Sequence, residues 1–184
     1  MNLVYLCRHF NLPEVADYWE QVVKMNNYQK NRFAKQIIDS LFNTVSGKKI
    51  AFLGWAFKKN TNDTRESAAI YVAGNLMNDK AEIHVYDPKV SKAQIIKDLK
   101  LVALSKEELD EMKKLIHIHN EPYSALKGAH AIAILTEWDE FVELDWENIF
   151  RGMLKPAFVF DGRNILDKKY MKELGFKYKG IGKG

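Results

Sequence analysis

The sequence predicts an α/β fold, with a long N-terminal helix followed by an open parallel sheet that carries helices on both faces. In the first 46 residues, apolar side chains recur at spacings of three and four, which is typical of amphipathic helices. From Gly47 onward, short and almost continuous apolar runs alternate with helix-like segments. This order is typical of parallel strands covered on both sides. We therefore expect helices in residues 1–46 and a Rossmann-like domain in residues 47–184.

Composition narrows the classes of partner and compartment. Hydrophobic residues make up 47% of the 184 residues, enough to bury the core of one domain. The net charge is +4, but the basic residues are scattered among nearly as many acidic ones. This scatter argues against a nucleic-acid partner and favours a small anionic ligand. The single cysteine excludes an internal disulfide and suits a reducing compartment. Without a signal-like segment or an apolar run of about 18 residues, we expect a cytoplasmic protein with no membrane partner.

The N-terminal helices begin with the short amphipathic piece NLVYLCRHFN, and Pro13 then suits the first turn of a second helix. Two apolar series follow: Val15, Tyr18, Trp19, Val22 and Met25, then Phe33, Ile37, Ile38, Leu41 and Val45. If they join through the polar segment NNYQKN, the helix has about 32 residues and is roughly 48 Å long. Two interpretations fit: a helical hairpin packed on the local core, or an interdomain or dimer helix.

The remainder of the chain gives the sheet. Apolar runs predict strands at 49–55, 83–87, 115–119, 129–135 and 157–162. The intervening segments predict helices at 66–77, 91–99, 105–113, 122–126, 146–153 and 168–174. Ser105 and Glu108 have the spacing of a capping box. The glycine-rich end from Gly180 is expected to be frayed.

Polar residues that directly follow the predicted strands are the candidates for a site, because ligands of such sheets bind beyond the carboxyl ends of the strands. They are Phe57, Lys58, Lys59 and Arg65; Asp87, Pro88 and Lys89; Thr136, Glu137, Trp138 and Asp139; and Asp161, Gly162, Arg163 and Asn164. Lysine supplies a point charge and arginine a bidentate fork, so this edge suits a phosphorylated ligand.

Each candidate also has a structural interpretation. Lys58 and Lys59 also fit solvated loop lysines, and Arg163 also fits an exposed arginine in a turn. Asp87 fits equally a ribose-binding acid and an ordinary Asp-Pro turn. Arg65 is expected in the first turn of a helix, where a cation opposes the helix dipole and therefore suggests an anionic partner.

Other reactive side chains give weaker signals. His117 and His119 alternate on a strand without the spacing of metal ligands, so we expect them to pack or face water and predict no metal site. Cys7 is expected to be a buried, inert thiol on a helix. Asp139 and Glu140 suit a solvated helix start better than an acid/base pair. The residues alone indicate an anion- or nucleotide-binding module that bears a long helix.

Several longer motifs occur in order along the chain: NLVYLC, KKIAFLGWAFKKNTNDTRES, IHVYDPKV, GAHAIAILTEWDEF and MLKPAFVFDGRNILD. Through them the sequence resembles, over essentially its whole length, the C-terminal part of UDP-glucose 6-dehydrogenases, in the UDP-glucose/GDP-mannose dehydrogenase family. The resemblance implies an enzyme that oxidises UDP-glucose to UDP-glucuronate with two NAD+ through a cysteine-bound intermediate. It also implies a homo-oligomer, a dimer or higher, formed through the long helix.

The resemblance assigns roles to parts of this chain. Residues 1–46 match the dimerisation helices, and residues 47–184 match the domain that binds the UDP-sugar. Phe57, Lys58 and Arg163 match positions that contact the substrate, and Arg65 matches an arginine that reaches the NAD site.

Departures from the family pattern are also expected to matter. The nucleophilic cysteine of the family would precede Met1, and Cys7 matches a different, helical cysteine. Without that cysteine and the NAD domain, these 184 residues are expected to be inactive alone. Asn60 and Asn62 stand where an aspartate and a small residue are expected. The alternatives are a non-catalytic oligomerisation module, a fragment of a related nucleotide-sugar dehydrogenase, and an independent NAD-binding protein. The last is disfavoured because no G-x-G-x-x-G follows the first strand.

Overall fold

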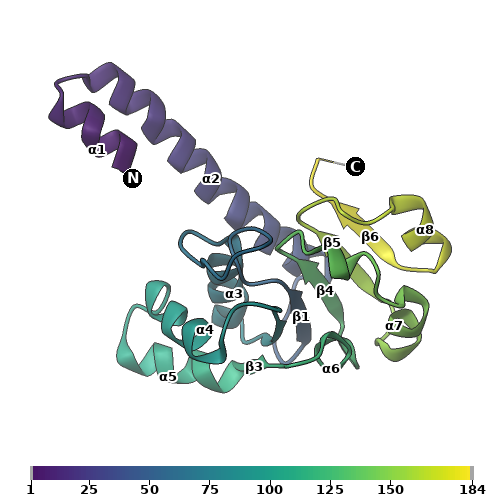
Figure 1. Ribbon diagram of the computed structural model, residues 1–184. Helices are drawn as coiled ribbons and strands as arrows, with labels where there is room; N and C mark the ends of the chain where they lie inside the picture. The colour runs from purple at the N-terminus through teal and green to yellow at the C-terminus, as the bar shows by residue number, and fades with distance from the viewer. Residues whose placement is uncertain (1, 183–184) are drawn as a thin grey trace.

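The computed structural model describes residues 2–182 and contains one six-stranded sheet (Figure 1). Its strands are β1 (Lys49–Leu53), β2 (Glu82–Tyr86), β3 (Ile116–Ile118), β4 (Ala131–Ile134), β5 (Phe158–Asp161) and β6 (Lys177–Gly180). They lie in the order β3-β2-β1-β4-β5-β6, and every neighbouring pair is parallel. This is the doubly wound order, in which the chain reverses direction across the sheet between β1 and β4. The expected α/β fold and its five strands are confirmed.

The sixth strand was not expected. In β6 only alternate residues, Tyr178 and Gly180, are buried, because this strand forms the edge of the sheet beside β5. Such a strand lacks the continuous apolar run of a central strand, so its sequence KYKG gives little signal. The expectation of a frayed end from Gly180 is wrong at that residue, since Gly180 pairs with Asp161.

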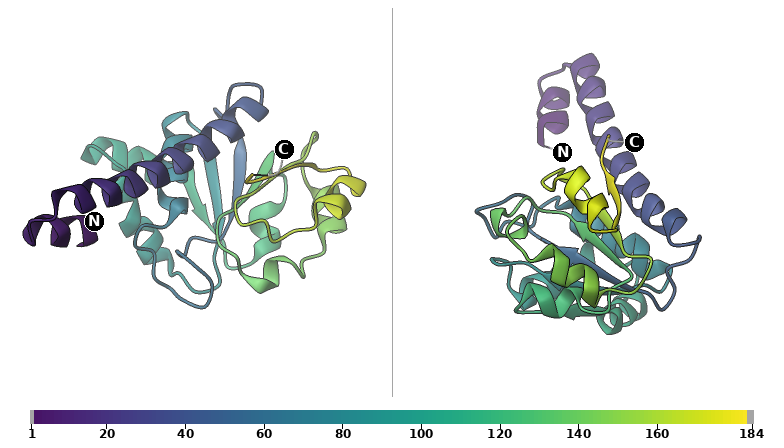
Figure 2. Two further views of the ribbon diagram at one scale, coloured as in Figure 1. Left: turned by 90° about the horizontal axis from the view of Figure 1, so that it is seen from above. Right: turned by 90° about the vertical axis from the view of Figure 1, so that its right-hand side faces the viewer.

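Helices cover both faces of the sheet (Figure 2). The connections from β1 to β3 contain α3 (Ala68–Asn78), α4 (Lys92–Asp98), the short 3-10 helix η1 (Leu99–Leu101) and α5 (Lys106–Leu115). Those from β3 to β6 contain α6 (Pro122–Leu126), the 3-10 helix η2 (Asp139–Phe141), α7 (Trp146–Gly152) and α8 (Lys168–Glu173). The chain moves from β1 toward β3 in one direction along the sheet, and from β3 toward β6 in the other. Because each crossover is right-handed, the helices of the first set of connections lie on one face and those of the second set on the other. The six predicted helices are present, with ends within two residues of those expected.

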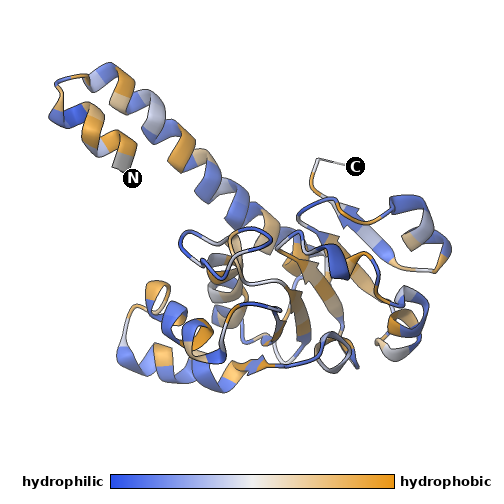
Figure 3. Ribbon diagram, in the orientation of Figure 1, coloured by the Kyte–Doolittle hydropathy of each residue, from blue (hydrophilic) through white to orange (hydrophobic). Residues whose placement is uncertain are grey.

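The core lies in the sheet and the inner faces of its helices, as the hydropathy colouring of the strands shows (Figure 3). Residues 50–53 of β1 and all of β4 and β5 are buried. Helix starts are fixed by side chains that accept backbone N–H groups, such as Ser67 before α3 and Ser105 before α5. These caps supply acceptors to backbone N–H groups that have no partner within the first helical turn.

The N-terminal helices are α1 (Asn2–His9) and α2 (Pro13–Ser40). The continuity of α2 through NNYQKN is confirmed, and its 28 residues make it about 42 Å long. The helix ends before Phe42 and Asn43, which adopt left-handed backbone angles. The predicted helix that runs on to Val45 is therefore too long at its C-terminal end. Near its C-terminus, Phe33 and Ile37 are buried in the core.

The other end of α2 projects from the sheet domain, and α1 folds back along it (Figure 1). Here large apolar side chains stay exposed, among them Tyr18 at 66% and Met25 at 56% of their full accessible surface. Part of α2 therefore belongs to the core of the domain, and part forms an arm. Among residues 2–182, no helix combines the length and the apolar character that a membrane span requires.

Gly54, the residue after β1, should be hard to replace. Its φ is +96°, and a Cβ atom there would lie 2.4 Å from the Thr136 side chain. Gly54→Ala is expected to lower the free energy of unfolding by about 3 kcal/mol or more, as measured by urea denaturation. Gly47→Ala is the control: its φ is +66° but nothing lies within 4 Å, so the backbone term alone should cost about 1 kcal/mol. Equal losses for the two variants would contradict this account.

Candidate functional site

The loop from residue 54 to residue 67 is organised by the carboxylate of Asp87 at the end of β2. It accepts five hydrogen bonds: from the backbone N–H groups of Trp55 (2.7 Å), Ala56 (2.9 Å), Lys89 (2.9 Å) and Val90 (2.9 Å), and from the indole N–H of Trp138 (3.2 Å). These bonds use both carboxylate oxygens inside the protein. Of the two interpretations of Asp87, the structure therefore favours the structural one.

The end of β4 also holds this loop. The buried Thr136 hydroxyl donates to the Ala56 carbonyl at 2.6 Å. The Lys59 ammonium donates to both oxygens of Asp139, at 2.7 and 3.0 Å, and the Lys59 backbone N–H donates to Glu137 at 3.4 Å. Lys59 thus has an internal carboxylate partner and is engaged in holding the loop.

Arg163, at the end of β5, bridges three strand ends. Its Nε donates to the Leu135 carbonyl at 2.7 Å, and its Nη2 donates to the Phe57 carbonyl at 3.0 Å. Glu137 Oε2 lies 3.3 Å from Nε and has no hydrogen-bond partner among the described residues. The guanidinium is therefore fixed between the loops that follow β1, β4 and β5.

Buried Asp161 positions the backbone of Arg163. Its carboxylate accepts the Arg163 N–H at 3.0 Å, the Leu166 N–H at 2.9 Å and the Tyr178 hydroxyl at 2.9 Å. Burial, together with the Asp161 charge, raises the pKa of the Tyr178 hydroxyl well above its ordinary value. Tyr178 therefore stays protonated and keeps donating to Asp161.

A cavity of about 730 Å³ lies between α2, α3 and these loops, within the size range of small-molecule sites. Its lining includes Val23, Asn26, Asn27, Gln29, Lys30, Phe33, Phe57, Glu66, Ala68, Tyr71, Val72, Leu135, Gly162, Arg163 and Ile181. Two of the predicted site residues, Phe57 and Arg163, thus meet in one cavity. The prediction that groups following different strands converge is confirmed for this pair.

Lys30 of α2 is a cavity residue that the sequence did not reveal. Its side chain is only 12% exposed, and its ammonium lies 3.6 Å from Glu66 Oε2 and 3.7 Å from the centre of the Tyr71 ring. Lys30 falls in the polar segment NNYQKN, where a solvated lysine is the ordinary expectation. Only the packing of α2 against α3 brings it to the site. The signal available in the sequence was that Lys30 is the one charged residue in the polar segment NNYQKN.

The other two predicted residues lie outside the lining of the cavity. Lys58 is exposed in the loop next to Phe57. Arg65 precedes α3, which begins at Ala68 with Ser67 as its cap, so the placement of Arg65 in the first helical turn is wrong. Glu66 has a left-handed φ of +61°, which delays the helix.

Arg65 has an anionic partner within its own loop. Its Nε and Nη2 donate to the Asp63 carboxylate at 3.0, 3.2 and 2.7 Å. The Arg65 hydrogen bonds hold the pKa of Asp63 at about 2, well below its usual range. The Arg65 side chain is 88% exposed, so this pair faces solvent and contributes little to stability. From the sequence, an anionic partner is expected for Arg65 because of its unfavourable place in the first turn of a helix. Because Arg65 precedes the helix and already has Asp63 as its partner, that argument does not support binding of an external anion.

Comparison with known proteins agrees with this geometry. Residues 51–168 match the UDP-binding domain of the UDP-glucose/GDP-mannose dehydrogenase family. UDP-glucose 6-dehydrogenase from Drosophila melanogaster is 54% identical over 183 residues, and that from Bos taurus is 56% identical over 185. Both alignments cover 100% of this chain, which spans 38% and 37% of the length of these relatives.

Solved structures show the same architecture. A UDP-glucose dehydrogenase from Pyrobaculum islandicum superposes with a TM-score of 0.66 at 23% identity, covering 98% of this chain and 35% of that one. A UDP-D-ManNAc dehydrogenase from Pyrococcus horikoshii gives a TM-score of 0.64 at 26% identity, covering 93% of this chain and 33% of that one. The likeness extends over the arm as well as the sheet domain.

Replacing Asp87 should test its role as the organiser of the loop. In Asp87→Asn one carboxylate oxygen is replaced by an N–H₂ group, which cannot accept a hydrogen bond. The backbone N–H groups that donate to that oxygen then lose their acceptor. The free energy of unfolding should fall by about 2–4 kcal/mol, measured by urea denaturation. Asp39→Asn, at an exposed position on α2, is the matched control and should change it by less than about 0.5 kcal/mol. A similar small effect at Asp87 would show that the loop does not depend on this carboxylate.

Proposed function

The chain belongs to the UDP-glucose/GDP-mannose dehydrogenase family, and on this premise we propose that it is the UDP-sugar-binding and dimerisation part of a UDP-glucose 6-dehydrogenase. The whole enzyme would oxidise UDP-glucose to UDP-glucuronate with two NAD+. The observation that carries the proposal is the match of residues 51–168 to the UDP-binding domain of the family. The matched region contains Phe57 and Arg163, which meet at the cavity.

The chemistry of the cavity supports a nucleotide-sugar ligand. Arginine has five N–H donors. Carbonyl groups accept two of those of Arg163, and the Glu137 carboxylate lies 3.3 Å from the same Nε that donates to Leu135. The remaining N–H groups of the guanidinium can donate to a phosphate or a sugar hydroxyl. The Phe57 ring is 47% exposed and offers a stacking surface for a base or sugar ring. Lys58 adds a charge beside it. These residues bind and orient the substrate, and we assign no catalytic residue within them.

The loop after β1 does not fit a dinucleotide. Its first backbone N–H groups, at Trp55 and Ala56, already donate to Asp87, and the loop carries only Gly54 where a dinucleotide fingerprint has three glycines. We therefore propose that NAD is bound mainly by another part of the whole protein, with Arg65 reaching toward it. The exposed Arg65 guanidinium is free to exchange Asp63 for an anionic group of the cofactor. We derive no chemical step through NAD from this chain.

We also propose that the arm formed by α1 and α2 pairs with the arm of a second copy. Trp19, Tyr18 and Tyr28 stay exposed at 37%, 66% and 59%, an apolar surface that a small domain seldom leaves uncovered. Residues 1–46 would then act in dimerisation and residues 47–184 in binding UDP-sugar. We also propose a cytoplasmic location, because the single cysteine of these 184 residues suits a reducing compartment.

Calorimetric titration of the 184-residue chain with UDP and UDP-glucose tests the binding proposal. We expect saturable binding that weakens about 10-fold in Lys58→Ala and by at least as much in Arg163→Ala, since each loses a charged contact with phosphate. Arg163→Lys should retain part of the charge but lose the fork. Lys89→Ala, an exposed lysine outside the cavity, is the matched control. If a folded wild-type sample binds neither ligand, the site is not complete in this chain.

Sedimentation equilibrium tests the arm. The wild-type chain should be a dimer or larger at tens of micromolar without nucleotide, and Trp19→Glu should shift it toward monomer. Lys24→Glu, which changes charge on the same helix without removing an apolar side chain, serves as the control. A wild-type monomer at this concentration refutes pairing through the arm, while binding of UDP by such a monomer would leave the site proposal intact.

A further inference from the structure

Three histidines and a glutamate gather on one face of β2 and β3. His84 pairs with His117 in the strand register, and their rings stack with centres 4.5 Å apart. The His119 ring lies 5.0 Å from that of His84. Glu82, two residues before His84, is on the same face of β2. The sequence spacing of His117 and His119 does not reveal this cluster, because its other members come from a different strand.

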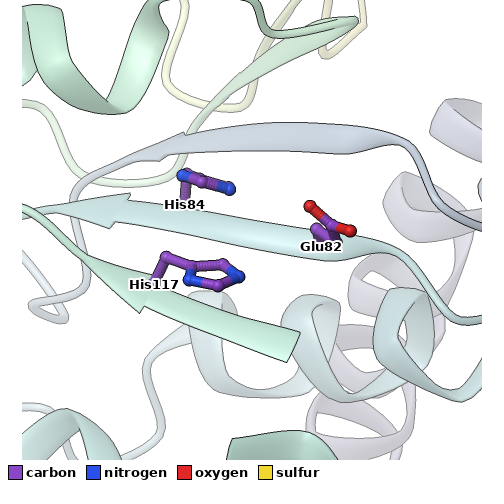
Figure 4. A group of neighbouring side chains, drawn as sticks. All are labelled: Glu82, His84 and His117. Atoms are coloured by element: carbon purple, nitrogen blue, oxygen red, sulfur yellow. The ribbon is translucent and has the colours of Figure 1, made fainter. Parts of the chain in front are cut away.

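The ligand atoms of Glu82, His84 and His117 all lie within 4.8 Å of one another. Figure 4 shows the three side chains on the same side of the two strands, with both imidazole rings extending toward Glu82. Tetrahedral ligands around a zinc ion lie about 3.4 Å apart, given metal–ligand distances near 2.1 Å. Side-chain rotations would therefore have to close up to about 1.4 Å, on a backbone that is fixed by the pairing of β2 with β3.

His119 orients the cluster from outside it. Its Nε2 lies 2.8 Å from His84 Nδ1, a hydrogen bond that occupies one ring nitrogen of His84 and leaves Nε2 for the cluster. Ligating histidines usually have such a partner on their second nitrogen. The Glu82 carboxylate is half-buried, and its negative charge acts on Lys49 and His130.

We propose that Glu82, His84 and His117 bind a divalent transition metal ion, with water completing its coordination. Two imidazole nitrogens and one carboxylate oxygen suit Zn²⁺, Ni²⁺ or Cu²⁺, whereas Mg²⁺ and Ca²⁺ prefer sites made of oxygen ligands alone. The exposure of His117 leaves the site open to solvent, as the remaining coordination positions require. A bound ion would tie the three-residue strand β3 to β2.

One neighbouring group opposes metal binding. Lys49 stands opposite Glu82 in the strand register and contributes a positive charge to the same face. Its ammonium is turned toward the Ser124 carbonyl, 3.5 Å away. The net affinity therefore reflects attraction by the carboxylate against repulsion by this lysine, and removing the lysine should strengthen binding.

The site is separate from the proposed nucleotide site. Glu82 is the first residue of β2, whereas Phe57 and Arg163 lie beyond the last residues of β1 and β5. Substitutions in the cluster therefore leave the cavity residues untouched. The metal proposal does not depend on the proposed function, and either can fail without the other.

The test is titration of the tag-free chain, stripped with a chelator, with Zn²⁺ by calorimetry and with Co²⁺ by absorption spectroscopy. We expect one ion per chain with a Kd below about 100 µM, reversed by chelator, and Co²⁺ bands in the visible range. His117→Ala and Glu82→Gln should each weaken binding about 10-fold or more. His119→Ala should weaken it by about 10-fold through loss of positioning, and Lys49→Met should tighten it.

His9→Ala provides the matched control, because His9 lies on α1, away from the sheet. Urea denaturation establishes that each variant is folded, and His117→Ala is the safest of them because His117 is exposed. The proposal is overturned if the folded wild-type chain binds no Zn²⁺ at 1 mM. It is equally overturned if His117→Ala binds as tightly as wild type, or if the His9→Ala control loses the ion.

Discussion

The carboxylate of Asp87 is the interaction on which the binding edge of this sheet depends. In a glycine-rich nucleotide fold, the backbone N–H groups after the first strand point at the phosphates of the ligand. Here the N–H groups of Trp55 and Ala56 point at Asp87 instead. The protein thus supplies its own anion to the first turn of the loop. Charged side chains further along the edge are then left to recognise an external phosphate.

Because Asp87 takes the place of a ligand phosphate in the first turn of the loop, the cations along this edge have other partners. Lys59 is paired with Asp139, which holds the loop against the end of β4, and Arg65 is paired with Asp63 in an ion pair that faces solvent. Arg163 is held by two carbonyl oxygens and also lies 3.3 Å from the Glu137 carboxylate. Of Lys59, Arg65 and Arg163, only Arg163 lines the cavity, and its hydrogen bonds fix its position there. Rigid placement of hydrogen-bond donors is the usual requirement for binding a ligand tightly.

The sequence predicted those parts of the fold that leave a local signal. Buried parallel strands such as β4 are continuous apolar runs, so they could be located, whereas the edge strand β6 could not. The meeting of Phe57 with Arg163 followed from the parallel order of the strands, since carboxyl ends share one edge. Lys30 and the cluster around His84 depend on which elements pack together, and one sequence without a structure does not contain that information. For Arg65, the left-handed Glu66 moved the helix start beyond it.

Helix α2 joins two regions of the molecule in a single stiff element. Phe33 packs edge-on against Phe160 in the sheet and lines the cavity, while the start of the same helix lies out on the arm. The helix therefore has the geometry of a lever with its pivot near Phe33. A tilt of about 5° at that point moves Pro13, roughly 30 Å away, by about 2.6 Å. Because α2 is this long, a rotation of a few degrees at the cavity wall would correspond to a displacement of ångströms at the tip of the arm.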